Sequence, residues 1–269
     1  HFATISKMAE AAGIEVAVLT ARAKGRERTE LLQRIANGRA QIVIGTHALF
    51  QDAVVYNNLT LAVVDEQHRF GVHQRLRLTA KGTAPHMLVM TATPIPRTLV
   101  LAAFGDMDVS KLTEKPAGRQ PIATVTIPDE RLGEIVDRLK SALLDGKKAY
   151  WICPLVEDSD QSELMSVESR HASLAKAFGK DLAPLVSLVH GRMTSDEKDQ
   201  AMRDFKNGVT RLLVATTVIE VGVDVPDATI MVIEHAERFG LAQLHQLRGR
   251  VGRGSGASSC ILLYHGPLG

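Results

Sequence analysis

Two adjacent carboxylates, Asp65 and Glu66, come directly after the apolar run Leu61-Ala-Val-Val64. Such a run is typical of a strand in a parallel sheet, and open α/β sheets bind ligands at the carboxyl ends of their strands. One carboxylate there can hold Mg²⁺, which keeps water and phosphate oxygens as its other ligands. The neighbouring carboxylate can orient an attacking water. The plainer alternative is a strand that ends in two solvated acids.

Hydroxyl groups end two further apolar runs. Thr91 and Thr93 follow residues 87–90, and two hydroxyls on a tight turn there can bridge neighbouring strand ends. Thr217 follows the run at 212–215, and Thr46 stands at the corresponding place earlier in the chain. Hydroxyls and backbone amides at such positions can bind a nucleic-acid phosphate. Ordinary strand-end turns are the alternative for each of these places.

Arginine and glycine alternate in the segment Gln246-Leu-Arg-Gly-Arg250-Val-Gly-Arg253-Gly. Glycine lets a backbone approach a ligand closely, and the planar guanidinium group suits phosphate. An arginine placed against a transferring phosphoryl group can raise the rate by about 10³–10⁵-fold. A basic surface loop is the alternative, but the regular alternation favours phosphate binding.

Short apolar runs alternate with amphipathic stretches, which predicts parallel α/β sheets. The pattern indicates helices over residues 26–36 and 195–207, with a capping box formed by Thr194 and Glu197. Gly38 and Gly208, each after an asparagine, predict helix ends. The runs have the length of strands buried on both faces, and they lie within residues 14–20, 40–46, 59–66, 86–93, 148–154, 185–191, 211–217, 228–235 and 258–264.

Two stretches of the chain match each other almost in register. Residues 18–46 align with 188–216 at an offset of 170, so that a strand, a helix and a second strand coincide without a gap. A following stretch aligns at an offset of 169, and it pairs Asp65 with Glu234 and residues 69–71 with residues 238–240. Chance could explain single matching letters. It is a poorer explanation for two consecutive blocks that agree in nearly the same register. We therefore expect two copies of one α/β unit in tandem.

The boundary between the copies is expected in the breaker-rich stretch 114–121, which gives domains of residues 1–116 and 117–269. The acidic, serine-rich stretch 157–169 predicts an exposed loop in the second copy.

Composition agrees with a globular protein of about two domains, at roughly 150 residues each. The 269 residues include 32 Lys+Arg and 30 Asp+Glu, which excludes a histone-like, strongly basic nucleic-acid binder. Two isolated cysteines, Cys153 and Cys260, cannot form a zinc site or a disulfide framework, and both lie in apolar runs that predict buried thiols. No run reaches the roughly 20 apolar residues of a membrane span, which together with the lack of a signal peptide favours the cytoplasm.

Order and spacing of these motifs resemble the superfamily-2 helicases and translocases. Asp65-Glu-Gln-His68, Arg69-Phe-Gly-Val72, the segment 91–98 (TATPIPRT) and the segment 246–253 (QLRGRVGR) closely resemble the RecG family of bacterial ATP-dependent branch-migration helicases. The resemblance extends across nearly the whole chain. It implies two tandem RecA-like parallel-sheet domains of the P-loop NTPase type, ATP and Mg²⁺ as cofactors, and branched double-stranded DNA, such as forks and Holliday junctions, as partner.

The resemblance also implies roles for individual residues. Asp65 would hold Mg²⁺, Glu66 would activate water, and Arg250 and Arg253 would be arginine fingers. Gln246, Gly222 and Asp224 would contact the nucleotide from the second domain. Residues coupling hydrolysis to domain motion would be Gln67, His68, Thr91 and Thr93, and residues tracking the DNA backbone would be Thr20, Thr46, His47, His190, Arg192 and Thr217. Ala21 departs from the pattern, because glycine is expected after Thr20.

Two other functions remain open from the sequence. The translocase module of the transcription-repair coupling factor carries similar segments, although the Asp-Glu-Gln-His form of the acidic motif favours the RecG family. A non-catalytic module that binds nucleic acid or protein on a degenerate motor fold is the other, and the intact acid pair and both arginines argue against it.

A phosphate-cradling segment of the form G-x-x-x-x-G-K-[ST] does not occur in these 269 residues. We therefore expect the first domain to be truncated at its N-terminus, and the isolated chain to hydrolyse ATP no faster than background. Phosphate release from the 269-residue chain with and without DNA measures this. Robust DNA-stimulated release would contradict the expectation.

Overall fold

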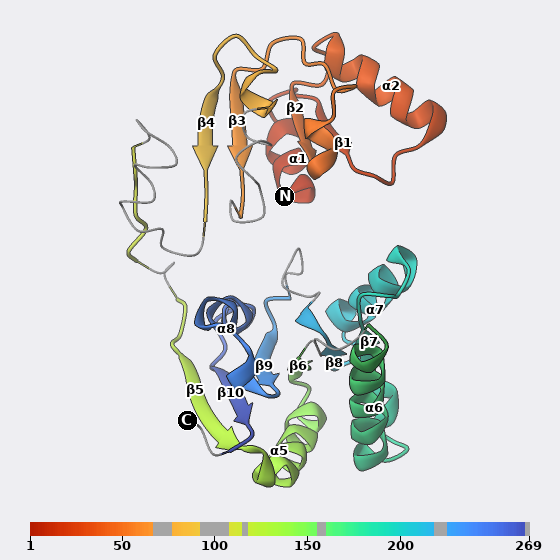
Figure 1. Ribbon diagram of the computed structural model, residues 1–269, viewed down its shortest axis with the longest axis vertical. Helices are drawn as coiled ribbons and strands as arrows, with labels where there is room; N and C mark the ends of the chain where they lie inside the picture. The colour runs from red at the N-terminus through yellow and green to blue at the C-terminus, as the bar shows by residue number, and fades with distance from the viewer. Residues whose placement is uncertain (67–76, 92–107, 115–117, 155–159, 218–224, 267–269) are drawn as a thin grey trace. The chain divides into compact units, whose positions relative to one another are not determined.

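The computed structural model describes residues 1–66, 77–91, 108–114, 118–154, 160–217 and 225–266. The chain divides into two compact units, His1–Asp106 and Met107–Gly269, and each contains parallel strands connected through helices (Figure 1). The predicted α/β class with parallel sheets is confirmed. Residues 116 and 117, between which the domain boundary is predicted, lie outside the described ranges, so that boundary stays a prediction.

The first unit contains two two-stranded parallel sheets, β1 with β2 and β3 with β4. Its core is built where α2 packs on the first sheet, around Leu19 and Ile35, with a second cluster around Val64. The elements are α1 (Phe2–Glu10), β1 (Val16–Leu19), α2 (Gly25–Ala36), β2 (Ile42–Gly45), the 3-10 turn η1 (His47–Phe50), β3 (Leu61–Val64) and β4 (His86–Val89).

Burial on both faces was expected for every strand and is wrong for β3 and β4. Ala62 and Val64 are buried, whereas Leu61, Val63 and Leu88 on the opposite face are each more than half exposed.

The second unit is a six-stranded parallel sheet in the order β5-β10-β9-β6-β8-β7. Its strands are β5 (Ile122–Pro128), β6 (Lys148–Ile152), β7 (Val186–Val189), β8 (Leu212–Ala215), β9 (Ala228–Ile233) and β10 (Ser258–Tyr264). Its helices are α5 (Leu132–Leu144), α6 (Asp160–Phe178), α7 (Ser195–Asn207) and α8 (Leu241–Arg248), with 3-10 turns η3 (Asp129–Arg131), η4 (Ala183–Leu185) and η6 (Ala236–Arg238).

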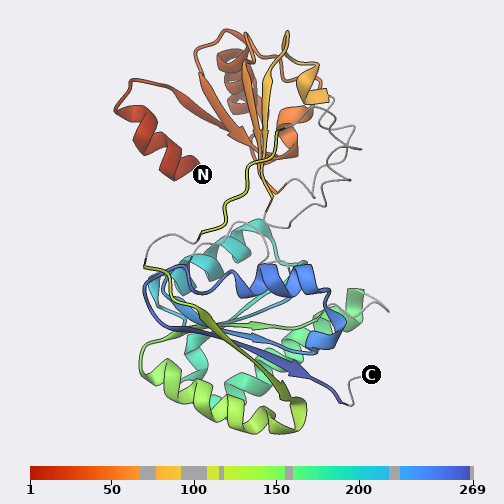
Figure 2. The same ribbon diagram turned by 90° about the vertical axis from the view of Figure 1, so that its left-hand side faces the viewer.

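Alternating side chains of β6 place this sheet between two layers of helices (Figure 2). Trp151, and Cys153 directly after the strand, point to the face that α5 and α6 cover. Tyr150 and Ile152 point to the face that α7 and α8 cover. Since all four side chains are at most 1% exposed, β6 is the centre of the unit's core.

The tandem duplication is visible in the element bounds. Strands β1 and β2 lie 170 residues before β7 and β8 with the same limits, and α2 precedes α7 by the same offset. Strands β3 and β9 end 169 residues apart, so Asp65 and Glu234 each directly follow the end of an equivalent strand. In the second unit β6 pairs with both β8 and β9 and joins the two halves of the sheet.

Helix α7 begins and ends as its sequence predicts. Thr194 Oγ1 accepts a hydrogen bond from the Glu197 backbone N–H at 3.3 Å, and Glu197 Oε2 accepts one from the Thr194 backbone N–H at 2.7 Å. Gly208 ends the helix in the left-handed conformation, with φ of 79°. Both features match a capping box and a glycine stop.

The expected exposed loop at 157–169 is wrong from residue 160 onward, because α6 starts there. Val167, Leu174 and Phe178 are spaced by seven and four residues, which places them on one helix face, and all three are buried against the sheet. The acidic and serine-rich composition reflects the polar residues of an amphipathic helix.

Both cysteines are unpaired and buried, as predicted. Burial raises the pKa of the Cys260 thiol to about 11, and burial beside Glu234 raises the pKa of Cys153 as well. Both thiols are therefore protonated and unreactive at neutral pH. None of the helices in the described ranges combines the length and apolarity that crossing a bilayer requires.

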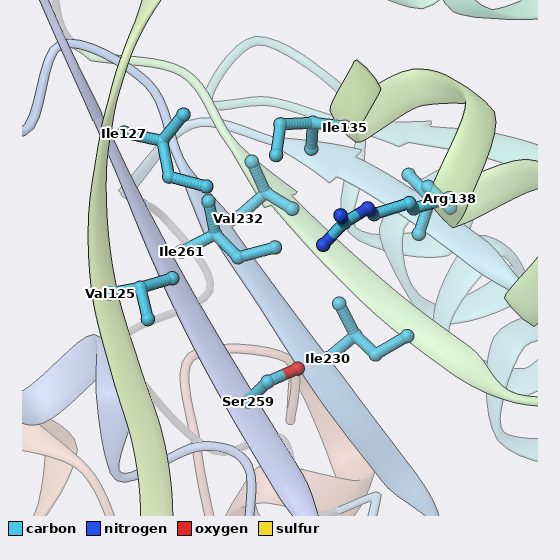
Figure 3. A pocket seen from close by; sticks show the side chains of 9 residues that line it. Val125, Ile127, Ile135, Arg138, Ile230, Val232, Ser259 and Ile261 are labelled. Atoms are coloured by element: carbon cyan, nitrogen blue, oxygen red, sulfur yellow. The ribbon is translucent and has the colours of Figure 1, made fainter. Parts of the chain in front are cut away.

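An apolar hollow of about 240 Å³ lies between α5 and the strands β5, β9 and β10 (Figure 3). Ile127, Ile230 and Ile261 contribute to its lining, and Arg138 reaches into it from α5. One guanidinium and the Ser259 hydroxyl on a mainly apolar surface supply little for phosphate chemistry. The candidate functional residues of this unit are on other elements.

Candidate functional site

The acid pair lies at the carboxyl end of β3, as the sequence predicts. The Asp65 side chain is 46% exposed, and its Oδ2 lies 3.0 Å from His1 Nε2. Its other oxygen, Oδ1, accepts a hydrogen bond from the Glu66 backbone N–H at 2.9 Å. Glu66 has a φ of 52°, in the left-handed region that residues with a side chain rarely adopt.

Thr91 joins the acid pair at the same edge of the sheet. The pairing of β3 with β4 sets Val64 beside Val89, and the Met90 backbone N–H donates to the Val64 carbonyl at 2.8 Å. Thr91 therefore follows β4 at the level where Glu66 follows β3. Gln67, His68 and Thr93 lie outside the described residues, so their predicted coupling roles stay predictions.

The oxygen donors at this edge suit Mg²⁺. The half-exposed Asp65 carboxylate is a hard oxygen ligand that a metal can reach. Within the described ranges, no group of three or more His, Cys, Asp or Glu side chains could hold a metal ion. That is compatible with Mg²⁺, which usually binds through one or two carboxylates together with substrate phosphates and water.

The predicted DNA-contacting residues of the first unit follow the paired strands β1 and β2. Leu19 is in register with Gly45, so Thr20 on one strand end neighbours Thr46 and His47 on the other. Gly45 must be glycine here, because a Cβ at this position would lie 2.2 Å from the Leu19 carbonyl oxygen. The close approach of the strands thus brings two hydroxyls and an imidazole to one sheet edge.

The second unit repeats this arrangement at the ends of β7 and β8. Val189 is in register with Ala215, which places His190 beside Thr216 and Thr217. The His190 side chain is 12% exposed and its Nε2 lies 4.0 Å from Glu168, whereas Arg192 is exposed. The structure therefore assembles the predicted backbone-tracking residues into two equivalent groups, one in each unit.

The arginine segment begins on α8 and continues into the following turn. Gln246 lies within α8, Arg250 and Arg253 come after it, and all three are partly buried. Arg253 Nε donates to the Gly249 carbonyl at 3.1 Å. Gly222 and Asp224, predicted to contact nucleotide from this unit, lie outside the described residues.

Glycines of this segment pack against the protein itself. A Cβ on Gly252, which has a φ of 72°, would lie 2.8 Å from an Ile122 side-chain carbon, and one on Gly254 would lie 2.7 Å from the Pro226 carbonyl oxygen. We expected the glycines to let the backbone approach a ligand. For these two, the close neighbours are β5 and the chain that leads into β9.

Arg170 was not among the predicted site residues, and its Nε lies 2.6 Å from Glu234 Oε1 in a largely buried ion pair. Arg170 directly follows the stretch 157–169, which was predicted as a loop. The repeat, which aligns Glu234 with Asp65, singles out Glu234. It does not indicate which residue pairs with Glu234.

Comparison with known proteins gives two family models that cover most of the chain. Residues 1–101 match the DEAD/DEAH box helicase model, and residues 134–255 match the helicase conserved C-terminal domain. These matches correspond to the two units of the fold.

Similar whole proteins share about half of their residues with this chain. It is 53% identical over 261 residues to the ATP-dependent DNA helicase RecG of Escherichia coli K12, which covers 95% of this chain and 37% of that protein. It is 49% identical over 263 residues to RecG of Bacillus subtilis 168, which covers 98% of this chain and 38% of that protein. The chain thus spans a little over a third of the length of these relatives.

A solved structure of RecG bound to a three-way DNA junction has the same fold, with a TM-score of 0.74 and 39% identity. The match covers 99% of this chain and 35% of that one. With this agreement in both sequence and structure over nearly all of its residues, the chain belongs to the RecG family of helicases.

Proposed function

We propose that the full-length protein is an ATP-dependent translocase on double-stranded DNA that remodels stalled replication forks and recombination junctions by branch migration, in the bacterial cytoplasm. The observation that carries this proposal is the identity of about 50% to RecG helicases across both units. It favours RecG-type remodelling over the translocase module of the transcription-repair coupling factor.

In this proposal the residues at the edge of the first unit's sheet act on ATP. Asp65 holds Mg²⁺, which neutralises phosphate charge when it is bound. Glu66 orients the attacking water and accepts its proton. Thr91 and Thr93, with Gln67 and His68, couple hydrolysis to movement of the units.

The second unit supplies the groups that respond to the nucleotide. Arg250 and Arg253 stabilise the negative charge on the phosphoryl group during its transfer. Gln246 detects the γ-phosphate, and Gly222 and Asp224 line the nucleotide. When the γ-phosphate leaves after hydrolysis, the contacts of these residues with the nucleotide change. The motor then has two states, one with ATP bound and one after phosphate release.

The two equivalent groups of strand-end residues grip the DNA backbone. Hydroxyls and backbone N–H groups contact phosphate oxygens without reading sequence, as a translocase requires. The nearly balanced charge of the chain, +2, is compatible with a grip that relies on these neutral donors as much as on cations.

The test compares ATP hydrolysis by the full-length protein on a three-way junction and on a linear duplex with the same arms. We expect the junction to stimulate hydrolysis several-fold more strongly and its strands to be re-paired in an ATP-dependent way. Equal stimulation by both DNAs, with no re-pairing, would contradict the proposed substrate class.

A further inference from the structure

Glu234 occupies the position in the second unit that Asp65 occupies in the first. Each is the first residue after its strand, β9 or β3. Their surroundings differ, because the Glu234 side chain is 9% exposed and the Asp65 side chain 46%. A position that presents a carboxylate to ligands in one unit is enclosed by protein in the other.

Two neighbouring elements, α6 and β6, surround the enclosed carboxylate. Arg170 Nε from α6 lies 2.6 Å from Glu234 Oε1, and Cys153 Sγ, just after β6, donates to Glu234 Oε2 at 3.5 Å. The Arg170 guanidinium lies 6.0 Å from the ring centroid of Trp151 on β6. The Glu234 backbone N–H also donates to the Ile152 carbonyl at 2.9 Å. Side chain and backbone of Glu234 are therefore both fixed.

Arg170 compensates the buried charge of Glu234. Burial raises the pKa of Glu234, and the neighbouring Arg170 acts against that shift. Removing one member of such a pair leaves an unpaired charge in the protein interior and is strongly destabilising, whereas neutralising both members is often tolerated. The pair can therefore be removed as a unit in an experiment.

The chain leaves Glu234 by a short and constrained path to the arginine segment. His235 is held in the left-handed region, with φ of 47° and ψ of 51°, and its Nδ1 lies 3.1 Å from Glu237 Oε1. After η6, Gly240 is the N-cap of α8, which carries Gln246. At the far end, Gly252 and Gly254 pack closely against Ile122 and Pro226. The segment is thus anchored on both sides of its functional residues.

We propose that the Arg170–Glu234 ion pair is a positioning element for the segment 235–253. It fixes the carboxyl end of β9, and through this the placement of Gln246, Arg250 and Arg253 toward the nucleotide. This inference rests on the nucleotide roles proposed above for those three residues. Arg170 and Glu234 themselves contact neither ATP nor DNA in this role.

The test uses the full-length protein with Arg170→Lys, which retains the charge but has no fork geometry, and with the double change Arg170→Met and Glu234→Gln. We expect kcat for DNA-stimulated ATP hydrolysis to fall about 10-fold in both variants, because arginine fingers act only in a defined geometry. KM for ATP and the Kd for junction DNA should change less than about 2-fold. Glu134→Gln, which breaks the exposed Arg131–Glu134 pair of the same unit, is the matched control and should retain wild-type turnover.

Amide hydrogen exchange in the same proteins provides a readout that lost stability alone does not give. We expect faster exchange over residues 241–248 in the Arg170→Lys variant and unchanged exchange over β7 and β8. Wild-type turnover and exchange in folded variants would overturn the inference. Uniformly faster exchange across the second unit, or loss of folding in both variants, would assign the pair to stability alone and also overturn it. If the wild-type protein shows no DNA-stimulated hydrolysis, the proposed function fails, and the exchange pattern still decides whether the pair positions the segment.

Discussion

Glu66→Gln in the full-length protein is expected to reduce ATP hydrolysis by about 10²–10⁴-fold, the range that a positioned general base contributes. The amide has nearly the size of the carboxylate, so the sharp turn at residue 66 remains, but it cannot accept the proton of the attacking water. ATP and junction DNA should still bind with affinities close to those of the wild type. Steady-state phosphate release and equilibrium nucleotide binding measure the two effects separately.

Glu134→Gln is the appropriate control for this change, because Glu134 is an exposed glutamate in the second unit, paired with Arg131. Its turnover should equal that of the wild type. Undiminished hydrolysis in the Glu66→Gln protein would refute the role assigned to Glu66. Loss of nucleotide binding together with turnover would instead identify Glu66 as a binding residue.

The second large effect is expected for Arg253→Ala, which should lower ATP turnover by about 10³–10⁵-fold if the guanidinium stabilises the transferring phosphoryl group. Arg253 is half-buried after α8, and its Nε donates to the Gly249 carbonyl, which holds the guanidinium in a defined orientation. Affinity for junction DNA should fall much less. Single-turnover hydrolysis and a DNA-binding titration give the comparison.

Arg131→Ala removes an exposed arginine of the same unit and should leave both quantities unchanged. A variant at 253 that loses DNA affinity but retains turnover would make this arginine a DNA ligand. In that case the alternation of glycine and arginine would belong to the DNA-binding surface.

Strand ends were the most predictable part of this fold. Apolar runs such as Leu61-Ala-Val-Val64 end abruptly in polar residues, and parallel pairing then brings Asp65, Glu66 and Thr91 to one edge of the sheet. The repeat predicted equivalent positions just as well, since the bounds of β1 and β2 recur in β7 and β8. Local sequence patterns are sufficient to predict the end of a strand where consecutive residues determine both its burial and its length.

Other features depend on contacts between distant residues. β5 was missed because four of its seven residues, 123–126, are exposed on an edge strand and its threonines weaken the apolar pattern. The helix that carries Arg170 has acidic and serine-rich residues in its first turns, and only its packing on β6 shows which face is buried. Gly252 packs against Ile122, which is 130 residues away in the chain. From the sequence, the glycine was explained by the approach of a ligand, whereas the structure explains it by this packing.

The left-handed backbone at Glu66 implies that stability and activity favour different residues at this position. A side chain in that conformation costs about 1–2 kcal/mol, and glycine would adopt it without strain. Folding alone would therefore select glycine directly after Asp65. A glutamate there makes the turn less stable than it could be. If Glu66 orients the attacking water as proposed, activity requires this loss of stability.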